Sequence, residues 1–298
     1  MENRDLLSYS RGANSDIDLH IHSNFSDGSY APEEIIDLVK ERGVTAFSVT
    51  DHDTLDGCKV LDRIRIPSGM SFFQGVEFSC KHKEVDLHML GYAFCLENKT
   101  INDLADKSSN FRKEKTERLA EYLREEHKII IPDEDMVILR GARSNVGKPN
   151  FAKILIRMGY GKSVKEVIEK YLNDFKAFDL KVEAEEAIKA ISAAVGFSSL
   201  AHPLIIMKDF KYGYDRIDTL VGELKEIGLD ALEVYYGEHS ERDKREFETI
   251  AKRHKLMMSG GSDFHGTNKP DIQIGDLGEG MNDCAYYRLC EFIYEMML

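Results

Sequence analysis

Cysteine is scarce in this chain of 298 residues, and its five cysteines are scattered. No two of them form a Cys-x-x-Cys pair, which argues against a disulfide framework and against a zinc site built from thiolates. A reducing cytosol fits this cysteine usage best, so we expect the protein to be cytoplasmic.

The sequence also lacks an apolar run of about 18 residues, the length that a membrane-spanning helix needs. Its N-terminal residues are polar and lack the apolar core of a secretion signal. Acidic residues outnumber basic ones by 53 to 40, which gives a formal charge of −13. We therefore expect neither a membrane nor duplex nucleic acid as a partner, although bound cations can reverse the local sign of charge for a phosphate.

What the chain does contain is an alternation of short apolar runs with helical patterns. The predicted strands are 16–22, 46–50, 71–79, 86–94, 197–201, 231–235 and 256–260. Helical patterns at 32–40, 183–194 and 217–227 each end at a glycine, which is typical of βα units and a mostly parallel sheet. Seven strands in this order predict an α/β barrel rather than an open sheet.

The segment 97–181 departs from this alternation, because it is highly charged, helical in pattern and poor in strand signals. We predict a small helical insertion domain there, which divides a discontinuous barrel domain into 1–96 and 182–298. Apolar residues at helical spacing in 283–298 predict a terminal helix that packs on the barrel.

Two histidines stand two residues apart in the first predicted strand. Side chains at i and i+2 of a strand point to the same face, so His20 and His22 can converge on one point, with the carboxylate of Asp27 close behind. Imidazole and carboxylate are ligands of divalent transition metals, whereas core packing does not require this pattern. Asp263 and His265 repeat the spacing after the last strand.

Other polar side chains follow the ends of predicted strands, where βα proteins bind ligands. His52 is a candidate ligand, with Asp51 and Asp53 as partners that fix its tautomer. The alternative is a polar loop that caps the next helix. Glu77 lies among apolar residues and, if buried, needs a partner such as a metal; otherwise it is an exposed strand residue.

Two more histidines belong to this pattern. His202 ends a predicted strand, which Pro203 terminates. His88 lies within an apolar strand, where a lone histidine is more often a hydrogen-bonded core residue than a ligand. The remaining histidines are by default surface residues, namely His82, His127, His239 and His254.

Six histidines and three carboxylates thus fall in or beside predicted strands. We predict that all of them are metal ligands: His20, His22, Asp27, His52, Glu77, His88, His202, Asp263 and His265. So many nitrogen and oxygen ligands exceed what one ion needs, and two to three divalent ions are expected. Without clustered cysteines, these ions should be Mn, Fe or Zn.

Together these segments resemble the polymerase and histidinol phosphatase (PHP) family. The resemblance rests on Asp-Leu-His-Ile-His-Ser at 18–23, Thr-Asp-His-Asp at 50–53, Gly-Val-Glu at 75–77, His88, Ala-His-Pro at 201–203 and Gly-Ser-Asp-Phe-His-Gly at 261–266. It implies a distorted (β/α)7 barrel with a helical insertion and a trinuclear metal centre at the carboxyl ends of the strands. The implied ligand sets are His20, His22, Glu77 and Asp263 for one ion, Glu77, His88 and His202 for a second, and Asp27, His52 and His265 for a third.

The resemblance is strongest to the stand-alone phosphoesterase branch, since Asp27 stands where histidinol phosphatases often carry histidine. In that branch the insertion offers basic residues to the substrate phosphate. Here these would be Lys148 and Arg143, unless both are solvated loop charges. Asn150 stands where the branch usually has histidine. His239 would be a substrate contact or a proton donor.

The implied catalytic residues are Glu77, Asp263, His265 and His239, and the expected reaction is hydrolysis of a small phosphate ester by a hydroxide that bridges two ions. The implied substrate is a nucleoside 3′,5′-bisphosphate, a short single-stranded oligonucleotide or a cyclic phosphodiester. The alternatives are a histidinol-phosphate phosphatase, an amidohydrolase-type enzyme and a non-catalytic metal or nucleotide sensor. An amidohydrolase usually carries a metal-bridging lysine, which we do not find at the predicted strand ends. The oligomeric state is left open.

Overall fold

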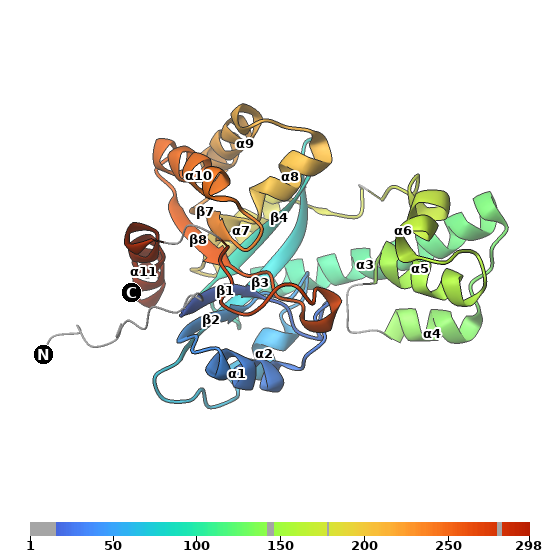
Figure 1. Cartoon of the computed structure of the whole chain (residues 1–298), viewed down its shortest axis with the longest axis horizontal. Coiled ribbons are helices and arrows are strands. Elements are labelled where there is room, and N and C mark those ends of the chain that lie inside the picture. The colour runs from blue at the N-terminus through green and yellow to red at the C-terminus, as the bar shows by residue number, and fades with distance from the viewer. Residues whose placement is uncertain (1–15, 142–145, 178, 279–281) are drawn as a thin grey trace, which may run out of the picture.

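Seven strands form a sheet that curves into a nearly closed barrel, in the order β1-β2-β3-β4-β6-β7-β8 (Figure 1). The computed structural model describes residues 16–141, 146–177, 179–278 and 282–298. The strands are β1 Ile17–Ile21, β2 Ala46–Val49, β3 Ser71–His82, β4 Val85–Tyr92, β6 Phe197–Leu200, β7 Ala231–Tyr236 and β8 Met257–Gly261, and a short β5, Val182–Glu183, pairs with β3. The predicted distorted (β/α)7 barrel is confirmed.

The barrel closes between its first and last strands. The backbone N–H of Asp263 donates to the carbonyl of His20 at 2.8 Å, and the N–H of His22 donates to the carbonyl of Phe264 at 2.9 Å. These bonds place the two histidine motifs, which lie at opposite ends of the sequence, side by side.

One strand runs against the others. β4 is antiparallel to both of its neighbours, β3 and β6, whereas the other neighbouring strands along the barrel are parallel. In this hairpin His88 pairs with Ser79 of β3. His88 therefore reaches the mouth of the barrel from within a strand rather than from a strand end.

Helices follow the parallel strands and cover the outside of the barrel (Figure 1). They are α1 Pro32–Glu41, α2 Asp56–Asp62, α7 Ala184–Ala193, α8 Pro203–Phe210, α9 Tyr214–Ile227, α10 Glu241–Arg253, a short 3-10 helix η2 Gly266–Asn268, and α11 Asp283–Met297. In α11, the predicted terminal helix, Leu289 and Phe292 are buried in the main core. Within the described ranges, no helix has both the length and the apolar character needed to cross a membrane.

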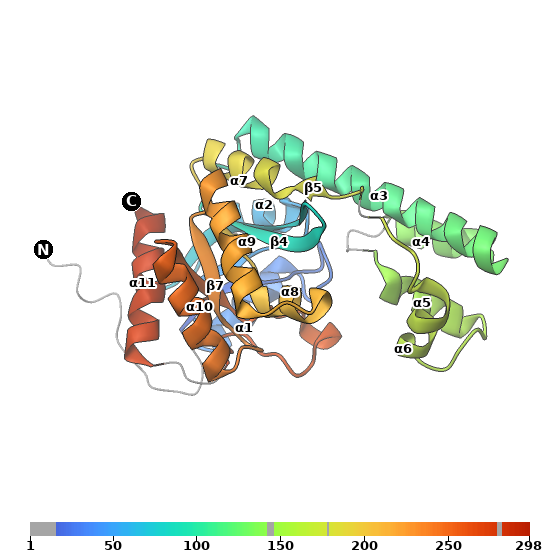
Figure 2. The ribbon, with the colours of Figure 1, turned by 90° about the horizontal axis from the view of Figure 1, so that it is seen from above.

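A helix of 29 residues, α3 Lys99–His127, leads away from the barrel (Figure 2). It is followed by α4 Asp133–Gly141, α5 Lys148–Arg157, α6 Val164–Val167 and the π-helix η1 Ile168–Leu172. Ile101 and Leu104 of α3 are buried in the main core, whereas Leu119 and Leu123 are buried in a second core with Phe151. The boundaries predicted for the insertion stay a prediction, because this one helix contributes to both cores.

Candidate metal centre

The nine predicted ligands gather at one mouth of the barrel. Three lie within strands β1, β3 and β4, and six lie in the loops that follow β1, β2, β6 and β8. His202 and Asp263 have positive φ angles of 25° and 60°, a conformation that is uncommon for residues other than glycine. Such backbone conformations concentrate at functional sites, where the surrounding structure holds them in place.

Glu77 is the centre of this cluster and is fully buried. Its Oε1 lies 2.9 Å from both Nδ1 of His88 and Nε2 of His202. Its Oε2 lies 3.2 Å from Nδ1 of His52 and from Nε2 of His22, and 3.3 Å from Nε2 of His20. The two oxygens of one carboxylate therefore face two separate groups of imidazoles.

Asp263 completes the group around His20 and His22. Its Oδ1 lies 3.2 Å from Nε2 of His22 and 3.5 Å from Nε2 of His20. This contact needs β8 very close to β1, and Gly261 permits it, because a Cβ there would lie 2.2 Å from Cβ of His20.

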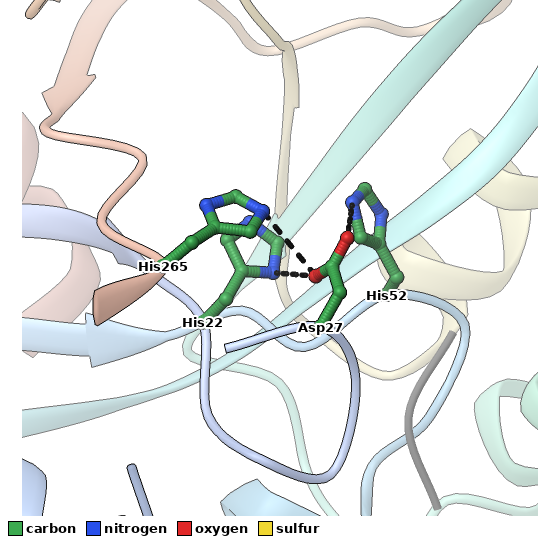
Figure 3. Close-up of side chains that lie close together, drawn as sticks. All are labelled: His22, Asp27, His52 and His265. Atoms are coloured by element: carbon green, nitrogen blue, oxygen red, sulfur yellow. Dashed lines mark ion pairs between the residues drawn. The ribbon is translucent and has the colours of Figure 1, made fainter. Parts of the chain in front are cut away.

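A second carboxylate, Asp27, lies among three imidazoles on the other side of His22 (Figure 3). Its Oδ1 lies 3.3 Å from Nε2 of His265 and 3.6 Å from Nδ1 of His22, and its Oδ2 lies 3.7 Å from Nε2 of His52. His22 and His52 thus each turn one ring nitrogen to Asp27 and the other to Glu77.

Two buried carboxylates that are not among the predicted ligands, Glu233 and Asp18, accept hydrogen bonds from the residues of the cluster and of the loops that carry them. Oε1 of Glu233 accepts a hydrogen bond from Nδ1 of His20 at 2.8 Å, and its Oε2 accepts one from the N–H of His202 at 2.6 Å. Asp18 accepts hydrogen bonds from the N–H and the hydroxyl of Ser262. No role is assigned to Glu233 or Asp18 from the sequence, because such contacts depend on which strands become neighbours.

Asp51 and Asp53, proposed above as partners of the His52 ring, make other hydrogen bonds. Asp51 accepts from the hydroxyls of Ser23 and Ser26, at 2.6 Å each. Asp53 accepts from the N–H of Ser79 at 2.6 Å. Their role in the folded chain is to hold the loops that follow β1 and β2 beside β3.

The cluster contains carboxylates that stay charged. Burial opposes the charged form of Glu77, but the neighbouring histidines His52, His88 and His20 outweigh burial and hold its pKa well below the usual range. Burial also acts to raise the pKa of Asp263, but nearby positive groups, His20 above all, outweigh burial and hold this pKa well below its usual value. Both groups therefore remain anionic ligands at neutral pH.

The imidazoles differ in protonation. Burial lowers the pKa of His52 to about 3, so this ring is neutral. Burial also acts to lower the pKa of His22, but hydrogen bonds with Asp263 and Glu77 outweigh it and raise the pKa to about 9. A cation that binds here replaces the proton that His22 holds.

The donor set fits divalent transition ions. Within the described part of the chain, three groups have ligand atoms within 4.8 Å of one another: His22, Asp27, His52 and His265; His20, His22 and Glu77; and His52, Glu77 and His88. Among the atoms that the structure describes, Oδ1 of Asp27 and Nδ1 of His52 are buried without a hydrogen-bond partner, as is expected of atoms that contact a metal. Nitrogen and oxygen donors without thiolate suit Mn, Fe and Zn.

Two basic residues, Arg143 and Lys148, are predicted to bind the substrate phosphate. Arg143 falls outside the described residues. Lys148 begins α5, and its ammonium group donates to the carbonyl of Asn173 at 3.4 Å. Burial and the nearby charge of Lys176 lower the pKa of Lys148.

His239 is not the surface residue that the sequence predicts by default, because only 1% of it is exposed. Its ring packs against Tyr236, and its Nδ1–H donates to the carbonyl of Val234 at 2.9 Å. Burial lowers its pKa to about 4, so the ring is neutral. Nε2 is then a hydrogen-bond acceptor, and it has no partner within the described structure.

Two cations beside the cluster were missed from the sequence. Lys269 donates to Oδ2 of Asp263 at 2.6 Å, and its position shortly after His265 is a signal that could have been used. Arg112 of α3 donates from Nε to Oδ2 of Asp53 at 2.6 Å. Nothing in the local sequence marks Arg112, because α3 meets the mouth of the barrel only in the folded chain.

Residues 18–262 match the PHP domain family. The chain is 28% identical over 266 residues to a 3′,5′-nucleoside bisphosphate phosphatase from Chromobacterium violaceum, which covers 88% of this chain and 91% of the relative. It is also 28% identical over 264 residues to the 5′-3′ exoribonuclease Rnm from Salmonella typhimurium, which covers 87% of each. A solved structure of an amidohydrolase from Chromobacterium violaceum, with bound sulfate and no metal, superposes with a TM-score of 0.74 at 26% identity, over 92% of this chain and 97% of that one. The chain therefore belongs to the PHP domain family.

Proposed function

We propose that this protein is a metal-dependent phosphoesterase that hydrolyses a small nucleotide. The observation that carries the proposal is the position of Glu77, whose two oxygens face separate groups of imidazoles, as suits a carboxylate shared by two cations. Membership of the PHP domain family supports it, as do relatives that are a nucleoside bisphosphate phosphatase and an exoribonuclease.

We propose Mn, Fe or Zn as the metal, with two to three ions in the ligand sets given above. When bound, the ions would supply positive charge that makes water nucleophilic near neutral pH and offsets the charge of the reacting phosphoryl group. Because the pKa values of Glu77 and Asp263 are low, both carboxylates are negatively charged at neutral pH and can bind cations.

The side chains around the ions have distinct tasks in this proposal. Glu77 and Asp263 would hold the cations of the first two ligand sets, and His265 would hold the third ion together with Asp27 and His52. The ammonium group of Lys269 contacts Asp263 at the mouth of the barrel, where it can also bind an oxygen of the substrate phosphoryl group. His239 is expected from the sequence to be a substrate contact or a proton donor, but its neutral ring carries its hydrogen on Nδ1, so we propose it instead as a proton acceptor through Nε2.

A pocket of about 160 Å³ adjoins the cluster and supports a small substrate. It is lined by His52 and Phe25 from the barrel and by Arg112 from α3. The aromatic ring of Phe25 suits a base, and Arg112 suits a phosphate. A nucleotide or the end of a short single strand fits a pocket of this size and lining better than a duplex or a membrane does. We also propose a cytoplasmic location.

A substrate panel tests the function. Protein loaded separately with Mn, Fe and Zn is given adenosine 3′,5′-bisphosphate, a 5′-phosphorylated trinucleotide, a cyclic phosphodiester, histidinol phosphate and an amide. We expect phosphate release or cleavage with the nucleotides, abolished by chelator and by His52→Ala or Asp263→Ala. His254→Ala, which removes a histidine outside the cluster, serves as the matched control and should keep wild-type turnover. Cleavage of the amide or of histidinol phosphate alone would refute the proposal.

A further inference from the structure

A second pocket of about 110 Å³ opens between α3 and the barrel, next to the metal centre, and it shares Asp53 and Arg112 with the pocket of about 160 Å³. We call it the α3 pocket and define it by Ser108, Arg112 and Lys115 of α3, by His88 of β4 and by Lys181 beside β5. His88 connects it to the cluster, because its ring lines this pocket while its Nδ1 contacts Glu77.

Three cations line this pocket in a chain whose overall charge is negative. Arg112 is paired with Asp53, and Lys181 is paired with Asp86 at 2.9 Å. Lys115 has no ion pair or hydrogen bond with any residue that the structure describes. Like charges held close together are unfavourable unless an anion joins them. Asp53, the carboxylate that lines this pocket, is already paired with Arg112, so Lys115 is the cation that lacks a negative partner among the described residues.

A buried hydroxyl gives the second indication of a ligand. Ser108 is only 3% exposed and lines the pocket, yet its Oγ has no hydrogen-bond partner in the described part of the chain. A buried hydroxyl without a partner costs free energy, and such groups are normally satisfied by a ligand or by water. An oxyanion with several acceptor oxygens satisfies the hydroxyl and the ammonium group of Lys115 together.

We propose that the α3 pocket binds a phosphoryl group of the substrate other than the one that is cleaved, through Ser108, Lys115 and Lys181. The inference rests on the proposed function and specifies it: the preferred substrate carries two phosphoryl groups, one at the metal centre and one beside His88. Lys115 is the main determinant of this preference, because Arg112 and Lys181 already have carboxylate partners.

The first test needs neither metal nor turnover. In chelator-treated protein at pH 8, acetylation of each lysine is followed by mass spectrometry with inorganic phosphate and, at equal ionic strength, with chloride. Burial and the charges of Lys181 and Arg112 lower the pKa of Lys115 to about 8, so its free amine reacts readily. Phosphate in the pocket should slow its acetylation several-fold, whereas exposed Lys99 should be unaffected. Equal rates for Lys115 in phosphate and chloride would overturn the proposal.

The second test compares substrates. Lys115→Met should raise KM for adenosine 3′,5′-bisphosphate about tenfold or more, the usual effect of losing a charge-assisted hydrogen bond, and leave adenosine 3′-monophosphate unchanged. Lys115→Arg should retain the preference, and Lys99→Met is the matched control on the same helix. Equal losses with both substrates, or no loss with either, would refute a subsite for the second group. If the wild-type protein cleaves no phosphate ester, the proposed function fails, and the acetylation test still decides whether the pocket binds phosphate.

Discussion

Substitution of Glu233 by Gln tests whether this carboxylate prepares His20 to bind a cation. Glu233 presents one acceptor oxygen to Nδ1 of His20 and the other to the backbone N–H of His202. Gln keeps the shape but has a single acceptor oxygen, and its amide nitrogen only donates. The backbone N–H of His202 cannot change its role, so it should take the oxygen and leave the NH2 group facing His20.

An NH2 group in place of an acceptor oxygen beside Nδ1 of His20 has two measurable consequences. If the Nδ1 of His20 keeps its hydrogen, two donors face each other in a buried site, which costs about 1–3 kcal/mol in the free energy of unfolding. If the hydrogen moves to Nε2, the ring loses the lone pair that faces Glu77 and Asp263. Loss of such a supporting contact typically lowers metal affinity about 10- to 100-fold, which is about 1.4–2.8 kcal/mol.

Both quantities are measured on the same preparations. Metal affinity is obtained by competition with a chromophoric chelator, and the free energy of unfolding of the metal-free protein by urea titration. Glu223→Gln is the matched control, because Glu223 also contacts a histidine, His82 at 2.9 Å, but outside the cluster. Wild-type values for Glu233→Gln in both measurements would show that the orientation of His20 does not depend on this carboxylate.

Three other predictions follow from the described contacts. Gly261→Ala should lower the free energy of unfolding by about 1–3 kcal/mol in a urea titration, because the new Cβ meets His20; an unchanged midpoint would contradict the close approach of β8 to β1. Free metal at about 100 times its Kd should add about 2.7 kcal/mol to stability and raise the thermal midpoint, and chelator should reverse the gain; identical midpoints would contradict the proposed metal centre. Burial raises the pKa of Cys58 to about 12, so at pH 8 its thiol stays neutral and should resist alkylation in the native protein, while exposed Cys95 reacts; mass spectrometry of the modified peptides separates the two.

The sequence was sufficient to predict the barrel and the gathering of the ligands for one physical reason. A histidine that follows a buried parallel strand must lie at the carboxyl end of that strand, and closure of the barrel brings such ends together. His52 and His202 follow two different strands and still meet at Glu77. Their proximity follows from topology, which the strand pattern reveals.

Contacts that depend on the faces and lengths of helices could not be predicted in this way. Arg112 and Lys115 are unremarkable charges in a helical pattern, and they become part of the site only because α3 crosses the mouth of the barrel. His239 is by default a surface residue in the sequence analysis, yet the chain after β7 folds its ring against Tyr236. Burial of a side chain in an irregular segment is decided by tertiary packing, which leaves no periodic signal.

Because α3 is one continuous helix whose residues are buried in both cores, it also fixes the rotation of the second core relative to the barrel. Each residue of an α-helix adds about 100° of rotation and about 1.5 Å of rise. Deletion of one residue between Arg112 and Leu119 would keep Arg112 at the barrel but turn the second core by about 100° around the helix axis. Insertion or deletion of about seven residues, close to two full turns, would keep the second core on the same side of the helix axis but change its distance from the barrel. This stretch therefore tolerates variation in surface residues far better than variation in length.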